Sequence, residues 1–291
     1  ALPIWPAGYR SVRPASVSGS DCNASSAFHL PAMPFKPRAI HQFHGGSANG
    51  DAITNGLFYI RGLLRDLGYA SEIFCEDVAP ELARDIHPAA SFPDSPDTVL
   101  IVHFSWAIRY FDWLQTLRCR KLLVYHNITP LEFFEAGGEF ERVAHVARQQ
   151  LAGLRDLVEG AFAPSDYNAR ELRALGFPRI EVLPLLFDPA AWRTAPYDAD
   201  FARRLAEDEA FTILFVGRVV ANKCQEDLLL VVERLRAMMR RPIKLVIVGG
   251  LGAGAVGQLP RSSPMIQSWS NCKPLASSRP RIWIGLSPLC G

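Results

Sequence analysis

The chain of 291 residues has no aspartate or glutamate after Glu233, so its small net charge of +2 conceals a basic C-terminal region. Nine lysines or arginines follow Glu233, but in the tail they are scattered among prolines and serines instead of lining one helical face. A nucleic-acid surface needs such clustering, so we expect no nucleic-acid partner.

Long apolar runs and closely spaced cysteines are also missing. No stretch approaches the roughly 20 apolar residues that cross a bilayer, and prolines and arginines interrupt the N-terminus where a secretion signal would need an apolar run. The six cysteines form no pair or Cys/His group with metal-ligand spacing. We therefore expect a cytoplasmic protein with reduced thiols and no bound metal.

What is present is typical of a folded globular protein: 49% of the residues are hydrophobic, 21% are charged, and the length indicates two domains. Residues 1–37 are rich in serine, proline and alanine, and we expect a poorly ordered leader there. From 38 to 190, apolar runs typical of strands alternate with helical patterns. Strands are expected at 39–43, 71–74, 98–102, 121–125, 160–163 and 180–183, and helices at 53–67, 106–117, 140–158 and 165–175.

Strands that alternate with helices of this length need crossover connections, so the predicted fold class is α/β with a doubly wound parallel sheet in residues 38–190. Residues 191–209 are expected to be a linker with a short helix. A second β-α-β unit begins in residues 210–250, with strands at 211–216 and 243–248 around a helix at 226–239. Residues 251–291 show no sustained period and are expected to be irregular.

A glycine-rich segment, His44 to Asp51, connects the first strand to the first helix. Gly45, Gly46 and Gly50 let the backbone approach a ligand closely, and the N–H groups at the start of the helix favour an anion. A tight turn without a ligand is an equally open interpretation.

Two histidines, His103 and His126, each end a predicted strand. A neutral imidazole at such a place can donate a hydrogen bond to a ligand hydroxyl or to a developing oxyanion. The neighbouring Asn127 adds a hydrogen-bonding group, which favours a functional interpretation for His126. For His103 a structural hydrogen bond is the favoured alternative.

The segment Phe215-Val216-Gly217-Arg218, followed by Asn222-Lys223, places two cations between an apolar strand and an amphipathic helix. A guanidinium and an ammonium at this position favour a diphosphate ligand, although solvated surface charges are the alternative. A nearby run, Gly252 to Gly257, matches GxGxxG, but no helix pattern or carboxylate follows it, so we do not expect a dinucleotide site there.

Taken together, these segments resemble glycosyltransferase family 4, retaining enzymes of the GT-B architecture with two Rossmann-like domains. The resemblance runs from about Ile40 to Gly250. It is carried by the glycine-rich segment, by Tyr125-His126-Asn127, by Ala163-Pro164-Ser165-Asp166-Tyr167-Asn168, by the run from Glu181 to Asp188, and above all by the segment from Phe215 to Lys223.

The resemblance implies transfer of a hexose from a UDP- or GDP-sugar co-substrate, with no bound cofactor, to a carbohydrate or lipid-linked acceptor, as in polysaccharide biosynthesis. It implies catalytic roles for His126, Arg218 and Lys223, and donor binding by Gly45, Gly46, Gly50, Gly217, Arg218 and Lys223. His103, Asn127, Ser165 and Asn168 are acceptor-side candidates. A lipid-linked acceptor would add peripheral contact with the inner face of the membrane.

The sequence departs from the family beyond Gly250, where members carry two acidic residues that contact the donor sugar and ribose. No acidic residue remains there, and the tail is typical of a truncated, frame-shifted or diverged end. A non-catalytic remnant, whose N-terminal domain only folds or binds acceptor, is therefore the alternative function. A sugar-nucleotide epimerase is a third possibility, weakened by the same absence.

Overall fold

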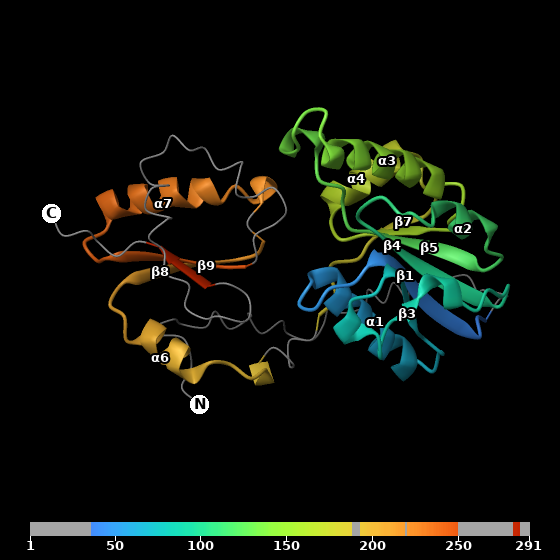
Figure 1. The fold of residues 1–291 in the computed structure, drawn as a ribbon, viewed down its shortest axis with the longest axis horizontal. Helices are drawn as coiled ribbons and strands as arrows, with labels where there is room; N and C mark the ends of the chain where they lie inside the picture. Colours follow the sequence, from blue (N-terminus) through green and yellow to red (C-terminus); the bar gives the residue numbers. More distant parts are fainter. Residues whose placement is uncertain (1–35, 188–192, 219, 250–281, 286–291) are drawn as a thin grey trace, which may run out of the picture. The chain divides into compact units, whose positions relative to one another are not determined.

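The computed structural model of the chain describes residues 36–187, 193–218, 220–249 and 282–285 (Figure 1). The described residues divide into two compact units, with the boundary between Thr194 and Ala195. We refer to them as the N-terminal unit and the C-terminal unit and describe each by itself. The leader expected at residues 1–37 lies almost wholly outside the described residues.

The N-terminal unit is built on a seven-stranded sheet in the order β3-β2-β1-β4-β5-β6-β7, and every pairing in it is parallel. The predicted α/β class and parallel sheet are therefore confirmed. The strands are β1 (Ala39–Gly46), β2 (Ile73–Asp77), β3 (His87–Pro88), β4 (Thr98–Phe104), β5 (Arg120–Tyr125), β6 (Ala161–Ala163) and β7 (Ile180–Val182).

The strand order reverses between β1 and β4. From β1 the chain builds outward to β2 and β3, and then returns to place β4 on the other side of β1. The connections that leave β1 and β4 therefore run in opposite directions. In open parallel sheets, ligands bind beyond the carboxyl ends of the strands at this kind of reversal.

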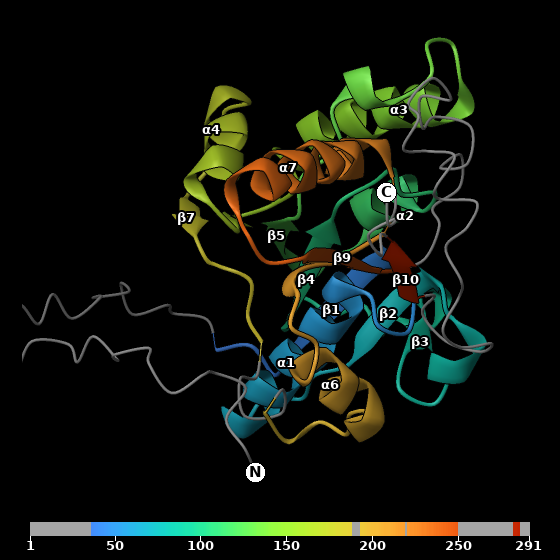
Figure 2. The ribbon, with the colours of Figure 1, turned by 90° about the vertical axis from the view of Figure 1, so that its left-hand side faces the viewer.

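Helices cover both faces of this sheet: α3 and α4 lie on one face and α1 on the other, as two views at right angles show (Figures 1 and 2). The helices are α1 (Ala52–Asp66), α2 (Phe111–Thr116), α3 (Glu139–Leu154) and α4 (Asp166–Ala174). Short 3-10 turns occur at η1 (Pro80–Leu82), η2 (Ala89–Ser91) and η3 (Leu131–Phe133).

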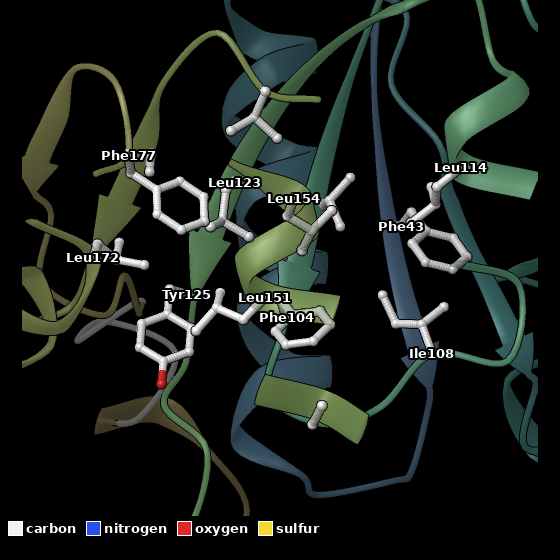
Figure 3. Close-up of a cluster of buried hydrophobic side chains, with 14 of the residues drawn as sticks. Phe43, Phe104, Ile108, Leu114, Leu123, Tyr125, Leu151, Leu154, Leu172 and Phe177 are labelled. Carbon is white, nitrogen blue, oxygen red and sulfur yellow. The ribbon is translucent and has the colours of Figure 1, made fainter. Parts of the chain in front are cut away.

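Two hydrophobic clusters form the core of the N-terminal unit, because successive strand residues point to opposite faces. In β2, Phe74 joins the larger cluster with α2, α3 and α4, whereas Ile73 and Cys75 join the smaller one with Leu57 of α1. Figure 3 shows part of the larger cluster, in which side chains from β1, β4 and β5 meet those of α3 and α4.

Two predicted helices are shorter than their patterns. The helix expected over residues 140–158 ends at Leu154, and the helix expected over residues 106–117 begins only at Phe111. The preceding loop is held by side chains from elsewhere in the unit. The side-chain amide of Gln150 bonds both backbone groups of Ile108, and the Glu76 carboxylate accepts from the N–H groups of Arg109 and Tyr110. These contacts replace the hydrogen bonds of a first helical turn.

The C-terminal unit contains a three-stranded sheet in the order β10-β9-β8. Strands β8 (Phe211–Val216) and β9 (Ile243–Val248) are parallel, as the β-α-β pattern predicted. Helix α7 (Gln225–Met238) connects them after the turn η4 (Ala221–Lys223), and α6 (Ala199–Ala206) precedes them. Within its described residues, this unit has one small buried hydrophobic cluster, which contains Leu229, Val232, Ile243, Leu245 and Ile247.

The third strand of this sheet, β10 (Ile282–Gly285), lies in the region where the sequence pattern indicated no element. It pairs antiparallel with β9. The sequence pattern missed this strand because four residues are too few for an alternating apolar period to be recognised.

Candidate functional site

Three histidines lie at the carboxyl ends of three neighbouring strands in the N-terminal unit. His44 is in the last part of β1, His103 is in β4 and His126 directly follows β5. The register pairs His44 with His103, and the N–H of His126 donates to the Phe104 carbonyl. We call these residues the histidine cluster. It lies at the place where the strand order reverses.

His103 and His126 are in direct contact. Nδ1 of His103 lies 2.9 Å from Nε2 of His126, and the two rings are almost parallel, at an interplanar angle of 16°. His103 is 1% exposed, and its Nε2 is buried with no hydrogen-bond partner, whereas His126 is half-buried. The buried ring of His103 is therefore in hydrogen-bond contact with the more accessible ring of His126.

The third imidazole, His44, contacts the last residue of its own strand and the residue that follows β4. Its Nδ1 lies 2.5 Å from the Gly46 carbonyl oxygen, which can only accept, so the proton is on Nδ1. Nε2 then carries a lone pair and accepts from the Ser105 hydroxyl at 3.2 Å. Both ring nitrogens of His44 are thus engaged within the unit, and the bond of Nε2 to Ser105 connects the end of β1 to the end of β4.

All three imidazoles are neutral at neutral pH. Burial lowers the pKa of His44, and burial followed by repulsion from His126 and His44 lowers the pKa of His103 well below its ordinary value. Burial, and then the nearby His44, lower the pKa of His126 to about 4. The cluster can therefore donate and accept hydrogen bonds, but it does not present a positive charge to an anion.

The glycine-rich segment is partly strand, because β1 continues through Gly46. Gly50 has φ 78°, a conformation that favours glycine, whereas a Cβ on Gly45 or Gly46 would make only ordinary contacts. The N-terminus of α1 is capped by the Asp51 carboxylate, which accepts from the N–H groups of Ile53 and Thr54. A phosphate at this helix end would lie beside that carboxylate, and donor binding by the three glycines stays a prediction.

The remaining acceptor-side candidates make hydrogen bonds within the unit. Asn127 has φ 73°, and its side-chain oxygen lies 3.4 Å from the Tyr125 hydroxyl, which donates its proton to the nearer Glu171 carboxylate at 2.6 Å. Ser165 is the N-cap of α4 and accepts from the backbone N–H of Asn168, whose side chain accepts from the Ser165 hydroxyl. The structure brings His103, His126 and Asn127 together, and it places Ser165 and Asn168 at a helix start. Their roles toward an acceptor stay predictions.

In the C-terminal unit, Gly217 and Arg218 directly follow β8, and Lys223 ends the turn before α7. Both basic side chains are exposed, and neither has an ion-pair partner among the described residues. The side chain of Gln225 donates to the Arg218 carbonyl at 2.9 Å, which fixes the backbone of this turn. The N-cap of α7 is Cys224, in a left-handed conformation, and its own side chain makes no capping hydrogen bond.

Two glycine backbones meet beside these cations. A Cβ built on Gly249, which follows β9, would lie 1.9 Å from the Gly217 carbonyl oxygen, far closer than any real contact. Only glycine fits at position 249. The carboxyl ends of β8 and β9 are therefore packed backbone against backbone, directly before Arg218.

No protein-family model matches this chain, and neither does any curated protein. The assignment of the site therefore depends on the geometry and on the resemblance of its motifs. Among the described residues no group of three or more His, Cys, Asp or Glu side chains could hold a metal ion. In the same part of the chain, none of the helices combines the length and the apolar character needed to cross a membrane.

The sequence patterns alone did not single out His44 or Ser105 as members of this site. His44 and Ser105 are 61 positions apart, and their contact depends on the β1–β4 register. The only signal that could have indicated them is their position at strand ends on either side of the reversal. That signal requires the strand order, which the sequence did not supply.

Proposed function

We propose that this chain is, by lineage, a retaining glycosyltransferase that moves a hexose from a UDP- or GDP-sugar to a carbohydrate or lipid-linked acceptor. The observation that carries the proposal is the pair of exposed cations, Arg218 and Lys223, between the carboxyl end of β8 and the N-terminus of α7. A guanidinium and an ammonium without ion-pair partners in the described residues match the oxygens of a diphosphate.

The chemistry follows from these charges. When the bond between the sugar and the diphosphate breaks, the leaving group gains negative charge, and cations already in position stabilise it. In a retaining mechanism the departing phosphate accepts the proton of the acceptor hydroxyl, which attacks from the same face of the sugar. Each charge-assisted contact contributes about 1.5–3 kcal/mol, so the loss of one would slow the reaction roughly 10- to 100-fold.

The N-terminal unit supports the same proposal. Its histidine cluster lies at the carboxyl ends of parallel strands, the side of such sheets on which ligands bind. Neutral imidazoles suit the hydroxyl groups of a sugar, because they exchange hydrogen bonds with them without attracting a phosphate. Under this proposal His126 contacts the transferred hexose or the acceptor.

Calorimetric titration with UDP and GDP tests the diphosphate site directly. We expect one of the two to bind the wild-type chain, and we expect R218A and K223A each to weaken binding roughly 10- to 100-fold. R234A is the matched control, since Arg234 is an exposed cation of α7 and lies away from the turn. Equal affinity of R218A and the wild type would contradict the proposed clamp.

Transfer is tested with UDP-glucose and GDP-mannose, by release of the nucleoside diphosphate and by the anomeric configuration of the product. We expect release to depend on both cations and the product to keep the configuration of the donor. An inverted product would contradict the proposed mechanism even if the diphosphate binds.

A non-catalytic remnant is the second candidate, and it is favoured by the absence of any acidic residue after Glu233. In this case the N-terminal unit folds, but the chain does not hold the donor. No heat with either nucleotide at millimolar concentration, from a chain with a cooperative unfolding transition, would favour the remnant over the enzyme.

A further inference from the structure

The contact between His103 and His126 can hold its proton in two ways. Either Nδ1–H of His103 donates to Nε2 of His126, or Nε2–H of His126 donates to Nδ1 of His103. Because both rings are neutral, each has one N–H and one lone pair. The direction of this hydrogen bond therefore also decides whether the other nitrogen of each ring, Nε2 of His103 and Nδ1 of His126, carries a proton or a lone pair.

The far nitrogen of His103 decides between the two arrangements. Nε2 of His103 is buried and has no hydrogen-bond partner. If His126 were the donor, His103 would carry its proton on Nε2, and an N–H group would be buried unpaired. If His103 is the donor, only a lone pair is left there. Unpaired buried N–H groups are rarer in proteins than unpaired acceptors, so the second arrangement is favoured.

The far nitrogen of His126 has different surroundings. Nδ1 of His126 makes no hydrogen bond within the described part of the chain. His126 is half-buried, and this nitrogen is not among the fully buried polar atoms without a partner, so solvent reaches it. The nitrogens of His44, by contrast, are both engaged, by the Gly46 carbonyl and the Ser105 hydroxyl. His126 is therefore the member of the histidine cluster that can meet a ligand.

We propose that His103 is a positioning residue that fixes His126 in the tautomer with its proton on Nδ1, so that the site presents an N–H donor and not a base at the end of β5. The ligand atom that meets His126 is then an acceptor oxygen. Its assignment to an oxygen of the transferred sugar rests on the proposed function, whereas the tautomer itself does not. Asn127, which follows in a left-handed conformation, contributes to the direction in which the chain leaves the ring.

The tautomer can be measured without any ligand. Two-bond proton–nitrogen correlation spectra of the ¹⁵N-labelled chain at neutral pH distinguish a protonated from an unprotonated ring nitrogen. We expect His126 to show a protonated Nδ1 and an unprotonated Nε2. The opposite pattern in the wild-type chain would overturn the proposal.

Two variants of His103 separate positioning from a merely structural role. H103N keeps an amide N–H near the place of Nδ1, and we expect it to preserve the Nδ1–H tautomer of His126. H103L removes the donor, and we expect His126 to shift toward the Nε2–H form that free imidazoles favour. H41L is the matched control, because His41 is a buried histidine of β1 whose contacts are with Glu72 and aromatic rings.

An unchanged His126 pattern in H103L, or its loss in H103N, would overturn the proposal. If H103L does not fold, the wild-type and H103N spectra still decide the outcome. Addition of millimolar UDP-glucose then tests the ligand assignment. We expect the Nδ1 resonance of His126 to move in the wild type. No movement, with the predicted tautomer present and the diphosphate bound, would overturn the sugar assignment and leave the diphosphate clamp standing.

Discussion

At the scale of single residues, the N-terminal unit buries imidazoles that stay neutral. Burial is the largest cause of the lowered pKa of His41, His44, His103 and His126. The folded chain therefore resists protonation at positions where the unfolded chain accepts protons easily. This difference links stability to pH.

We predict that the N-terminal unit loses stability as the pH falls from about 6.5 to about 4. In this range the unfolded chain binds protons at these histidines, whose ordinary pKa is 6.5, while folded His126 has a pKa of about 4. Glu76 has the opposite effect on stability, because burial raises its pKa. It is a single group, whereas four histidines have a lowered pKa. Urea unfolding at pH 7 and pH 5 measures the effect.

The matched variant for this prediction is H126Q, which removes one of the titrating groups. It should unfold with a smaller difference between the two pH values than the wild type. An unfolding midpoint that does not change between pH 7 and pH 5 would contradict the neutral state assigned to the histidine cluster.

The positions of His103 and His126 at strand ends could be predicted from the sequence, because an apolar run that stops at a polar residue indicates the end of a buried strand. Their contact with one another could not. It depends on the side-by-side register of β4 and β5, which pairs His103 with Val124 and places the His126 ring beside His103. Local sequence patterns contain no information about register between strands.

At the scale of elements, α1 begins where Asp51 accepts hydrogen bonds from two backbone N–H groups. We predict that D51A destabilises the N-terminal unit by about 1 kcal/mol, the usual effect of removing an N-cap. Asp66 at the last position of the same helix provides the control. There a carboxylate opposes the helix dipole, so D66A should leave stability unchanged or raise it slightly. Equal losses in both variants, by urea unfolding, would contradict the capping role.

The turn beside Arg218 gives a second prediction at this scale. G249A places a Cβ 1.9 Å from the Gly217 carbonyl oxygen, so the ends of β8 and β9 must move apart and the C-terminal unit should lose stability. G56A is the control, because a Cβ on this helical glycine of α1 meets nothing within 4 Å and should stabilise by roughly 0.5–1 kcal/mol. Thermal unfolding of both variants distinguishes the two effects.

Helix periodicity predicted where α1, α3, α4 and α7 lie, and β8 and β9 have the bounds that the apolar runs indicated. It failed at residues 106–110 because their backbone groups bond to Glu76 and Gln150, more than 30 positions away along the chain. The periodicity of a local segment contains no information about side chains, distant along the chain, that compete for its backbone hydrogen bonds. The same reasoning applies to Ser105, whose partner is His44.

At the scale of the whole molecule, the two units differ in the size of their cores. The N-terminal unit has two clusters on the two faces of a seven-stranded sheet, whereas the described part of the C-terminal unit has one small cluster between α7 and its sheet. Less buried apolar surface means less stabilisation against unfolding. The two units should therefore not unfold together.

We predict that hydrogen exchange separates the two units. Peptides from β4 and β5 should stay protected at urea concentrations at which peptides from β8 and β9 have already exchanged. Mass spectrometry of the exchanged chain measures this directly. A single common transition for all four strands would indicate that the units stabilise each other.

The antiparallel strand β10 limits how the small C-terminal sheet can grow. A strand has two hydrogen-bonding edges, and those of β9 are already taken by β8 and β10. A further parallel strand can join only beside β8 or beyond β10. The segment from Ile282 to Gly285 therefore excludes any other strand from the second edge of β9.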